Sequence, residues 1–126
     1  MKGLVLSVAI LLGLAAPAWA GLAEGVAAYQ RGDYAAALRE FRPLAEQGDA
    51  GAQTSLGIMY FIGEGMPRDL TRAYMWYDPA SSRFPPGAAR DDAVRNRDFV
   101  AKHMTGAQIA EARRLAREWK PKKEGK

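Results

Sequence analysis

The segment LGIMYFIGEGMPRDLTRAYMWY, residues 56–77, decides how this chain folds. It is apolar and aromatic, but Gly57, Gly63 and Gly65 interrupt it and Pro67 follows them. Such glycines serve either a loop whose backbone cradles a phosphate or the close crossing and turning of two packed helices. The two alternatives predict different kinds of protein, and the flanking sequence separates them.

Apolar residues on both sides of this segment recur three and four positions apart, which is the spacing of an amphipathic helix. The three stripes are Tyr34, Ala37, Leu38, Phe41, Leu44 and Ala45; then Ala52, Leu56 and Tyr60; then Ile109, Ala112, Leu115, Ala116 and Trp119. The strict alternation typical of a half-buried strand does not occur. We therefore expect an all-α protein, with a bend or a rebuilt last turn at Pro43.

The expected helix starts are evenly spaced. Asp33, Asp69 and Thr105 follow one another at intervals of 36 residues, and each is a favoured N-cap type. Gln108 stands three residues after Thr105 and completes a capping box. This period predicts a short α-solenoid of stacked antiparallel helix pairs, because a single pair cannot bury its own apolar faces.

Residues 52–77 carry the pattern A-x-x-x-L-G-x-x-Y-x-x-G-x-G-x-x-x-D-x-x-x-A-x-x-W-Y. Its positions are Ala52, Leu56, Gly57, Tyr60, Gly63, Gly65, Asp69, Ala73, Trp76 and Tyr77. The pattern closely resembles the Sel-one-like repeat, a relative of the tetratricopeptide repeat, with this central repeat at about residues 50–80. Residues 25–53 resemble a shorter tetratricopeptide-like unit, and residues 95–119 are similar to the closing helix pair that follows such repeats in bacterial exported proteins. The resemblance implies a helical-repeat domain over residues 21–119.

After Trp76 the sequence departs from the repeat pattern, because it contains prolines. Pro79 falls inside the expected second helix, and Pro85 and Pro86 follow it. Proline removes a backbone donor and disfavours the helical state of the residue before it. We therefore expect this helix to end or kink near Tyr77, with an irregular loop over residues 81–86. Gly106 is also a weak opener for the last helix.

The repeat explains the glycines of the opening segment. Gly57 should sit where the partner helix crosses closely, while Gly63 and Gly65 should turn the chain in positive-φ conformations. A phosphate-cradling loop would need a preceding strand and usually a lysine or hydroxyl at the next helix start. The preceding segment is instead helical in pattern, and Arg68 is the one basic residue nearby. The packed-helix interpretation is favoured.

The chain begins with the features of a secretory signal peptide, residues 1–20. Lys2 precedes an apolar run over residues 4–14, and small residues flank Trp19 at the expected cleavage site after Ala20. We expect a periplasmic or secreted product with no transmembrane segment in the mature chain. The sequence contains no cysteine, which excludes disulfides and a cysteine-linked lipid anchor.

Positive charge is concentrated at the carboxyl end. Of the 126 residues, 18 are lysine or arginine and 14 are acidic. Arg113, Arg114, Arg117, Lys120, Lys122, Lys123 and Lys126 fall in the last stretch, against Glu118 and Glu124. We expect residues 120–126 to form a disordered basic tail, which is either simply solvated or attracted to an anionic surface.

The titratable residues suggest no catalytic, cofactor-binding or metal-binding site. The single histidine, His103, has no carboxylate at helical spacing, so a structural or solvent-facing role is favoured. The acidic group Asp91, Asp92 and Asp98 alternates with arginines, and pairs such as Asp91 with Arg95 predict a solvated helix face. The chain is therefore not expected to be an enzyme.

Aromatic and aliphatic residues are the remaining candidates. Tyr60, Trp76 and Tyr77 occupy core positions of the repeat, and Trp119 should cap the stack. Beside them, Thr54, Ile58, Phe61 and Ile62 occupy positions that face the concave groove in the related tetratricopeptide fold. Either they form an apolar strip that binds a partner protein, or a neighbouring helix pair or the Phe84 loop covers them.

Two functional hypotheses follow. The first is an exported, non-catalytic helical-repeat scaffold in the cell envelope that binds a protein or peptide through the strip Thr54, Ile58, Phe61 and Ile62. The alternative is an envelope adaptor whose basic carboxyl end docks on anionic lipid or cell-wall polymer. Nucleic acid is not expected as a partner, because the body of the chain is slightly acidic and export removes it from nucleic acid.

Overall fold

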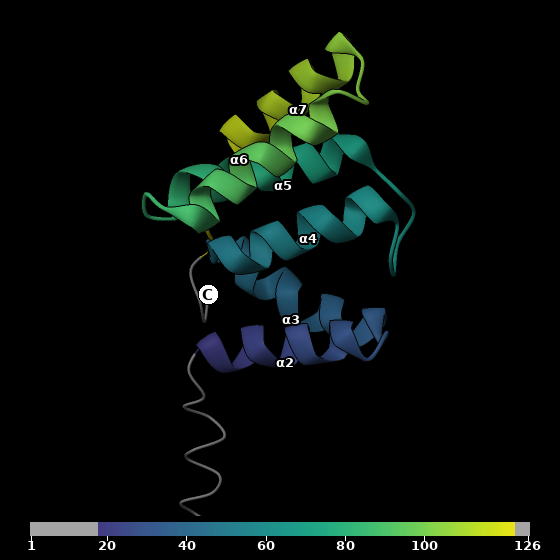
Figure 1. The fold of residues 1–126 in the computed structure, drawn as a ribbon, viewed down its shortest axis with the longest axis vertical. Coiled ribbons are helices and arrows are strands. Elements are labelled where there is room, and N and C mark those ends of the chain that lie inside the picture. The colour runs from purple at the N-terminus through teal and green to yellow at the C-terminus, as the bar shows by residue number, and fades with distance from the viewer. Residues whose placement is uncertain (1–17, 123–126) are drawn as a thin grey trace, which may run out of the picture.

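The structure is a computed structural model, and it describes residues 18–122 (Figure 1). This part of the chain is all-α and contains six helices and no strand. The helices are α2 (Ala18–Gln30), α3 (Tyr34–Glu46), α4 (Ala50–Ile62), α5 (Leu70–Arg83), α6 (Ala88–Ala101) and α7 (Gly106–Glu118). The all-α prediction is confirmed for the described residues. Most of the predicted signal peptide lies outside them.

Side-chain caps define the helix starts. The carboxylates of Asp33 and Asp69 each accept a hydrogen bond from the backbone N–H of the residue three positions later, at 3.1 and 3.0 Å. Thr105 and Gln108 form the reciprocal capping box that their spacing predicts. Asp49 caps α4 in the same way, at 2.8 Å, although the 36-residue period does not include it. Each cap satisfies a donor that the first helical turn leaves free.

Helices adjacent in sequence pack against each other from α2 through α6, whereas α7 has its main contact with α5. In Figure 1, α2, α4 and α6 lie nearer the viewer, and α3, α5 and α7 lie behind them. Helix α5 has its main contacts with three helices, α4, α6 and α7. The last two helices are joined chiefly through α5, not through each other.

The core has two parts that meet along α5. The larger cluster contains buried residues of α2, α3 and α4 together with two from α5: Ala28, Ala37, Phe41, Leu44, Ala45, Ala52, Leu56, Met59, Met75 and Trp76. The smaller cluster joins α5 to the last two helices through Ala73, Tyr74, Tyr77, Val100 and Ala112. Met75 and Trp76 of α5 thus serve the larger cluster while Ala73, Tyr74 and Tyr77 serve the smaller one, because this helix is buried on more than one side.

Both interior prolines are accommodated within helices. Pro43 lies inside α3, and Pro79 lies inside α5, which continues to Arg83. Of the two predicted outcomes near Tyr77, an end of the helix is therefore wrong, while a kink stays a prediction; the irregular segment begins at Phe84 instead of residue 81. Pro79 and Ala80 are buried against neighbouring helices, and this packing outweighs the one backbone hydrogen bond that proline removes.

The glycines of the central segment have the roles that the repeat pattern predicts. A Cβ added at Gly57 would come within 2.7 Å of the Tyr77 ring, so the absence of a side chain permits the crossing of α4 and α5. Gly63 ends α4 with φ of 85° and Gly65 follows with φ of 81°, both in the left-handed region.

The carboxyl-terminal segment after α7 runs back past α5 to α3. Trp119 packs edge-on against Trp76, with ring centroids 6.2 Å apart, and the Arg83 guanidinium lies 5.6 Å from the Trp119 ring centre. The Lys122 backbone N–H donates to the Glu46 carbonyl at 2.7 Å, and its ammonium lies 3.2 Å from the Glu46 carboxylate. Of the predicted tail, residues 120–122 are described, and they contact α3 in this way.

Candidate binding surface

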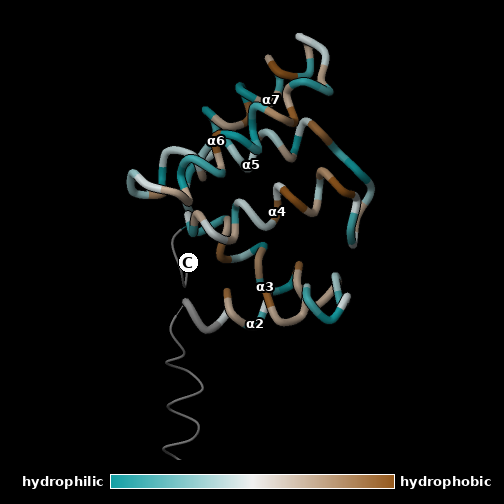
Figure 2. The backbone as a smooth tube through the Cα atoms, viewed as in Figure 1, coloured by the Kyte–Doolittle hydropathy of each residue, from teal (hydrophilic) through white to brown (hydrophobic). Residues whose placement is uncertain are grey.

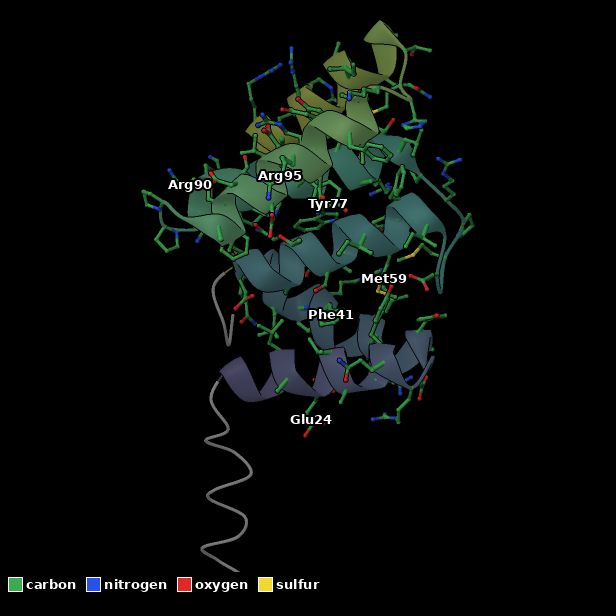
Figure 3. All side chains as sticks on the ribbon, viewed as in Figure 1. Glu24, Phe41, Met59, Tyr77, Arg90 and Arg95 are labelled. Atoms are coloured by element: carbon green, nitrogen blue, oxygen red, sulfur yellow. The ribbon has the colours of Figure 1, made fainter. Side chains whose placement is uncertain are left out.

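An apolar hollow lies between α2 and α4, with a volume of about 150 Å³. We call it the first hollow; its lining is Val26, Tyr29, Phe41, Ser55 and Ile58. Phe41 comes from α3, behind the other two helices, and Figure 3 shows its side chain in the space between α2 and α4. Two neighbouring front helices therefore form the walls, and an aromatic ring from the rear helix forms the floor.

A second hollow repeats this arrangement between α4 and α6, with a volume of about 330 Å³. Its lining is Ile58, Phe61, Tyr77, Asn96, Phe99 and Val100. Tyr77 of α5 lies beneath, as Phe41 does in the first hollow, and Figure 3 shows it above α4. Ile58 lines both hollows and forms the ridge that separates them. We call the two hollows together the binding groove.

The floors depend on close contacts between rings and glycines. A Cβ at Gly25 would come within 2.5 Å of the Phe41 ring, just as a Cβ at Gly57 would meet Tyr77. In α2, Val26 and Tyr29 stand one and four residues after Gly25, and in α4, Ile58 and Phe61 stand one and four residues after Gly57. The same spacing on two helices thus produces one wall of each hollow.

One hydrogen bond links the wall of the first hollow to the loop after α4. The Tyr29 hydroxyl donates to the Glu64 carboxylate at 2.6 Å. This bond, together with partial burial, raises the pKa of Tyr29 to about 12, because the carboxylate stabilises the protonated phenol. Burial also raises the pKa of Tyr77 beneath the second hollow. Both tyrosines are neutral at physiological pH, so the groove lining carries no charge from them.

An aromatic cluster extends the second hollow along its rim. Phe61 and Phe99 meet edge-on with ring centroids 5.7 Å apart, and His103 lies 5.1 Å from Phe99. Arg68 lies over the Phe61 ring at 5.2 Å, and its Nε donates to the Phe61 carbonyl at 2.9 Å. Phe99 is 50% exposed in spite of these contacts, so half of its ring remains open to solvent.

The structure distributes the sequence-predicted strip unevenly. Ile58 and Phe61 line the binding groove, whereas Thr54 and Ile62 line neither hollow. Thr54 is half-buried and donates its hydroxyl to the Ala50 carbonyl at 3.0 Å, while Ile62 is 55% exposed. In Figure 2 the carboxyl-terminal half of α4 includes strongly hydrophobic stretches of the tube, in agreement with this placement.

Sequence reasoning missed the groove residues on the neighbouring helices. Val26 and Tyr29 could have been found, because they repeat the spacing of Ile58 and Phe61 after a glycine. Asn96 and Phe99 carry no such signal, since α6 has no glycine and its main contact is with α5. Of the predicted core aromatics, Trp76 and Tyr77 are buried, and Tyr60 is half-buried.

The charged groups of α6 are arranged differently from the predicted pairing. Arg95 pairs with Asp92, three residues away, and not with Asp91. Arg97 contacts Asp98 and also reaches Asp78 on α5 at 3.2 Å, with only a quarter of its side chain exposed. This face is therefore not wholly solvated, because Arg97 links α6 to α5. The pairing with Asp92 is possible because residues three apart on a helix are neighbours, as residues four apart are.

His103 stays on the surface, and its Nδ1 lies 3.2 Å from the Phe99 carbonyl. Within the described residues, no three histidine or acidic side chains gather closely enough to hold a metal ion. No helix in this part of the chain is long and apolar enough to cross a membrane.

Comparison of the chain with models of protein families, with curated proteins and with solved structures finds no match.

Proposed function

We propose that this protein is a short α-solenoid scaffold of the Sel-one-like type that binds a peptide segment of a partner protein in the binding groove. The observation that supports it best is the pair of adjoining hollows, which share Ile58 and remain open between α2, α4 and α6. Their rims include Val26, which is 40% exposed, and Phe99. Exposed apolar surface that follows a groove is typical of sites for protein partners.

The size of the hollows favours a peptide over a small molecule. Sites for small ligands usually enclose about 300–1,000 Å³. The first hollow is smaller than that range and the second is at its lower edge, at about 150 and 330 Å³. Each has room for one or two apolar side chains. A peptide that crosses Ile58 would place a side chain in each hollow, while Ser55 and Asn96 offer polar groups at the walls.

The repeated construction of the groove supports the repeat interpretation. Phe41 and Tyr77 stand 36 residues apart, and each lies over a glycine of the helix in front of it. A scaffold built from such units would need no catalytic group, which agrees with the neutral lining of the groove. We further propose that the protein is exported and processed after Ala20; amino-terminal sequencing of protein recovered from the host tests this.

Selection of a random peptide library on the purified protein tests the groove. We expect the selected peptides to share two apolar side chains at a constant separation, one for each hollow. Ile58→Asp should weaken their binding at least tenfold, because it places a charge on the ridge between the hollows. Phe99→Asp should also weaken peptide binding. Half of the Phe99 side chain is already exposed, so this change should disturb the fold less.

Ile62→Asp is the matched control, since it makes the same chemical change on the same helix outside both hollows. We expect it to bind the selected peptides as the original protein does. Circular dichroism on all three variants checks that each remains folded. Peptides that bind Ile58→Asp and Phe99→Asp at full affinity would place the site elsewhere and overturn the proposal.

A further inference from the structure

Arginines line two further hollows that adjoin along the outer side of α3. The hollow beside α3 has a volume of about 530 Å³ and is lined by Ala35, Leu38, Arg39, Arg42, Pro43, Glu46 and Gly65. The next, at the start of α5, has a volume of about 450 Å³ and is lined by Arg42, Tyr60, Met66, Pro67, Arg68, Asp69 and Arg72. Arg42 belongs to both, so the hollows adjoin. We call Arg39, Arg42, Arg68 and Arg72 the basic face.

The orientation of α3 separates the basic face from the groove. Phe41 points inward and forms the floor of the first hollow, whereas Arg39 and Arg42 are exposed. Arg39, Arg42 and Glu46 follow one another three and four residues apart, so they share one side of the helix. A ligand bound at Arg39 and Arg42 therefore does not occupy the binding groove, whereas Arg68, at the edge of the basic face, also lies over the Phe61 ring of the second hollow.

The two acidic residues of these hollows already have cationic partners. Glu46 is held by Lys122, whose ammonium lies 3.2 Å from its carboxylate. Asp69 caps α5 and lies 3.5 Å from the Arg72 Nε. Among the described residues, no carboxylate is within salt-bridge distance of Arg39 or Arg42. The basic face is thus left with uncompensated positive charge at its centre.

We propose that the basic face binds a linear polyanion, a flexible chain with closely spaced oxyanion groups. All four cations are arginines, whose planar guanidinium groups bind phosphate and carboxylate oxygens through paired hydrogen bonds. Adjoining hollows that share Arg42 suit successive groups of one chain better than a single ion. This inference does not depend on the proposed peptide groove, and it places anion binding on α3 instead of on the basic carboxyl end.

A membrane surface fits the basic face less well than a polymer does. Docking on anionic lipid usually combines basic residues with large apolar side chains that enter the bilayer interface. The exposed large hydrophobic residues of the described chain are Val26, Ile62 and Phe99, none of which lines these hollows. The concave shape also favours a chain that lies within it over a flat bilayer.

Binding of fluorescently labelled polyphosphate and polyglutamate by the purified protein, measured over a range of salt concentrations, tests the inference. The two polymers distinguish phosphate from carboxylate as the preferred oxyanion. We expect Arg39→Gln/Arg42→Gln to weaken binding of the preferred polymer at least tenfold. The slope of log affinity against log salt concentration should fall by about 1.5, since two ionic contacts are lost.

The matched control is Arg95→Gln/Arg114→Gln, which removes the same charge from α6 and α7, and it should bind nearly as the original protein does. An equal loss in both double variants would show a general charge effect and overturn the inference. So would binding of inorganic phosphate as tight as that of the polymer. Stronger binding to anionic vesicles than to either polymer would also overturn it. Binding of the selected groove peptides should persist in Arg39→Gln/Arg42→Gln, so failure of one proposal does not imply failure of the other.

Discussion

Helices α4 and α5, the central pair, and helices α6 and α7, the end pair, have nearly equal lengths but very different burial. The central pair buries five residues of α4 and eight of α5. The end pair buries two residues of α6, Ala93 and Val100, and one of α7, Ala112. Asp49, Asp69 and Thr105 cap α4, α5 and α7 with their side chains, whereas α6 begins after Gly87 without a side-chain cap.

The difference in burial between the two pairs reflects the number of helices packed against each. The central pair lies between α3 on one side and the end pair on the other, whereas the end pair has packed neighbours on one side only within the described chain. Surface ion pairs, such as Arg114 with Glu111 and Glu118, take the place of apolar contacts along α7. Such exposed pairs each contribute little to stability. The central pair should therefore dominate the free energy of unfolding.

The strongest way to break this comparison is to truncate one aromatic residue in each pair. Tyr77 is 2% exposed in the central pair, and Phe99 is half exposed in the end pair. We expect Tyr77→Ala to lower the free energy of unfolding by about 4 kcal/mol, through lost transfer energy and a cavity. Phe99→Ala should lower it by about 1 kcal/mol. Urea denaturation measures both losses, and equal losses would contradict the inference that the central pair dominates the free energy of unfolding.

The same substitution at two glycines sharpens the comparison. A methyl group at Gly57 would meet the buried Tyr77 ring, whereas a methyl group at Gly106 in α7 has no heavy atom within 4 Å. We expect Gly57→Ala to lower the free energy of unfolding by about 2 kcal/mol, because the crowded ring must move. Gly106→Ala should raise it by up to about 1 kcal/mol, because alanine favours a helix. Thermal melting of both variants checks the opposite signs, and stabilisation by Gly57→Ala would contradict the close crossing.

The smallest effect is expected at the contact that joins the first helices to the central pair, and it depends on pH. The pKa of Tyr29 is raised to about 12 by its hydrogen bond to Glu64, against about 10 in the unfolded chain. The unfolded state therefore loses this proton first, and the contribution of Tyr29 to stability falls as pH rises through that interval. Tyr29→Phe should lower the free energy of unfolding by about 1 kcal/mol at pH 8 and make its decline above pH 10 shallower.

The control for this pH effect is Arg97→Gln, which removes the contact between the end pair and the central pair at Asp78. It should reduce stability without changing the decline above pH 10, because the pKa of Arg97 is raised above an already high value. Burial opposes the charged guanidinium, but the bonds to Asp98 and Asp78 outweigh it. Urea denaturation at several pH values tests both variants, and an unchanged decline in Tyr29→Phe would contradict the role of Tyr29.

Much of the central pair could be predicted from the chain itself. The cap at Asp69, the crossing at Gly57 and the turn at Gly63 and Gly65 all depend on residues close in sequence. Pro79 shows the limit of this reasoning, since the local preference to end the helix is opposed by burial against helices that are distant in sequence. The candidate site shows the same limit: Ile58 and Phe61 were identified, but their partners Val26 and Phe99 are supplied by other helices.

The sequence by itself determined that the described part of the chain is helical, that helices begin after Asp33, Asp69 and Thr105, and that Gly57 permits a close crossing, because periodicity, capping and backbone freedom are local properties. Only the tertiary structure decided which apolar residues remain open in the binding groove and which arginines adjoin on the basic face. It also decided that α7 packs on α5. Exposure and charge compensation depend on which distant segments pack nearby, and no single stretch of sequence contains that information.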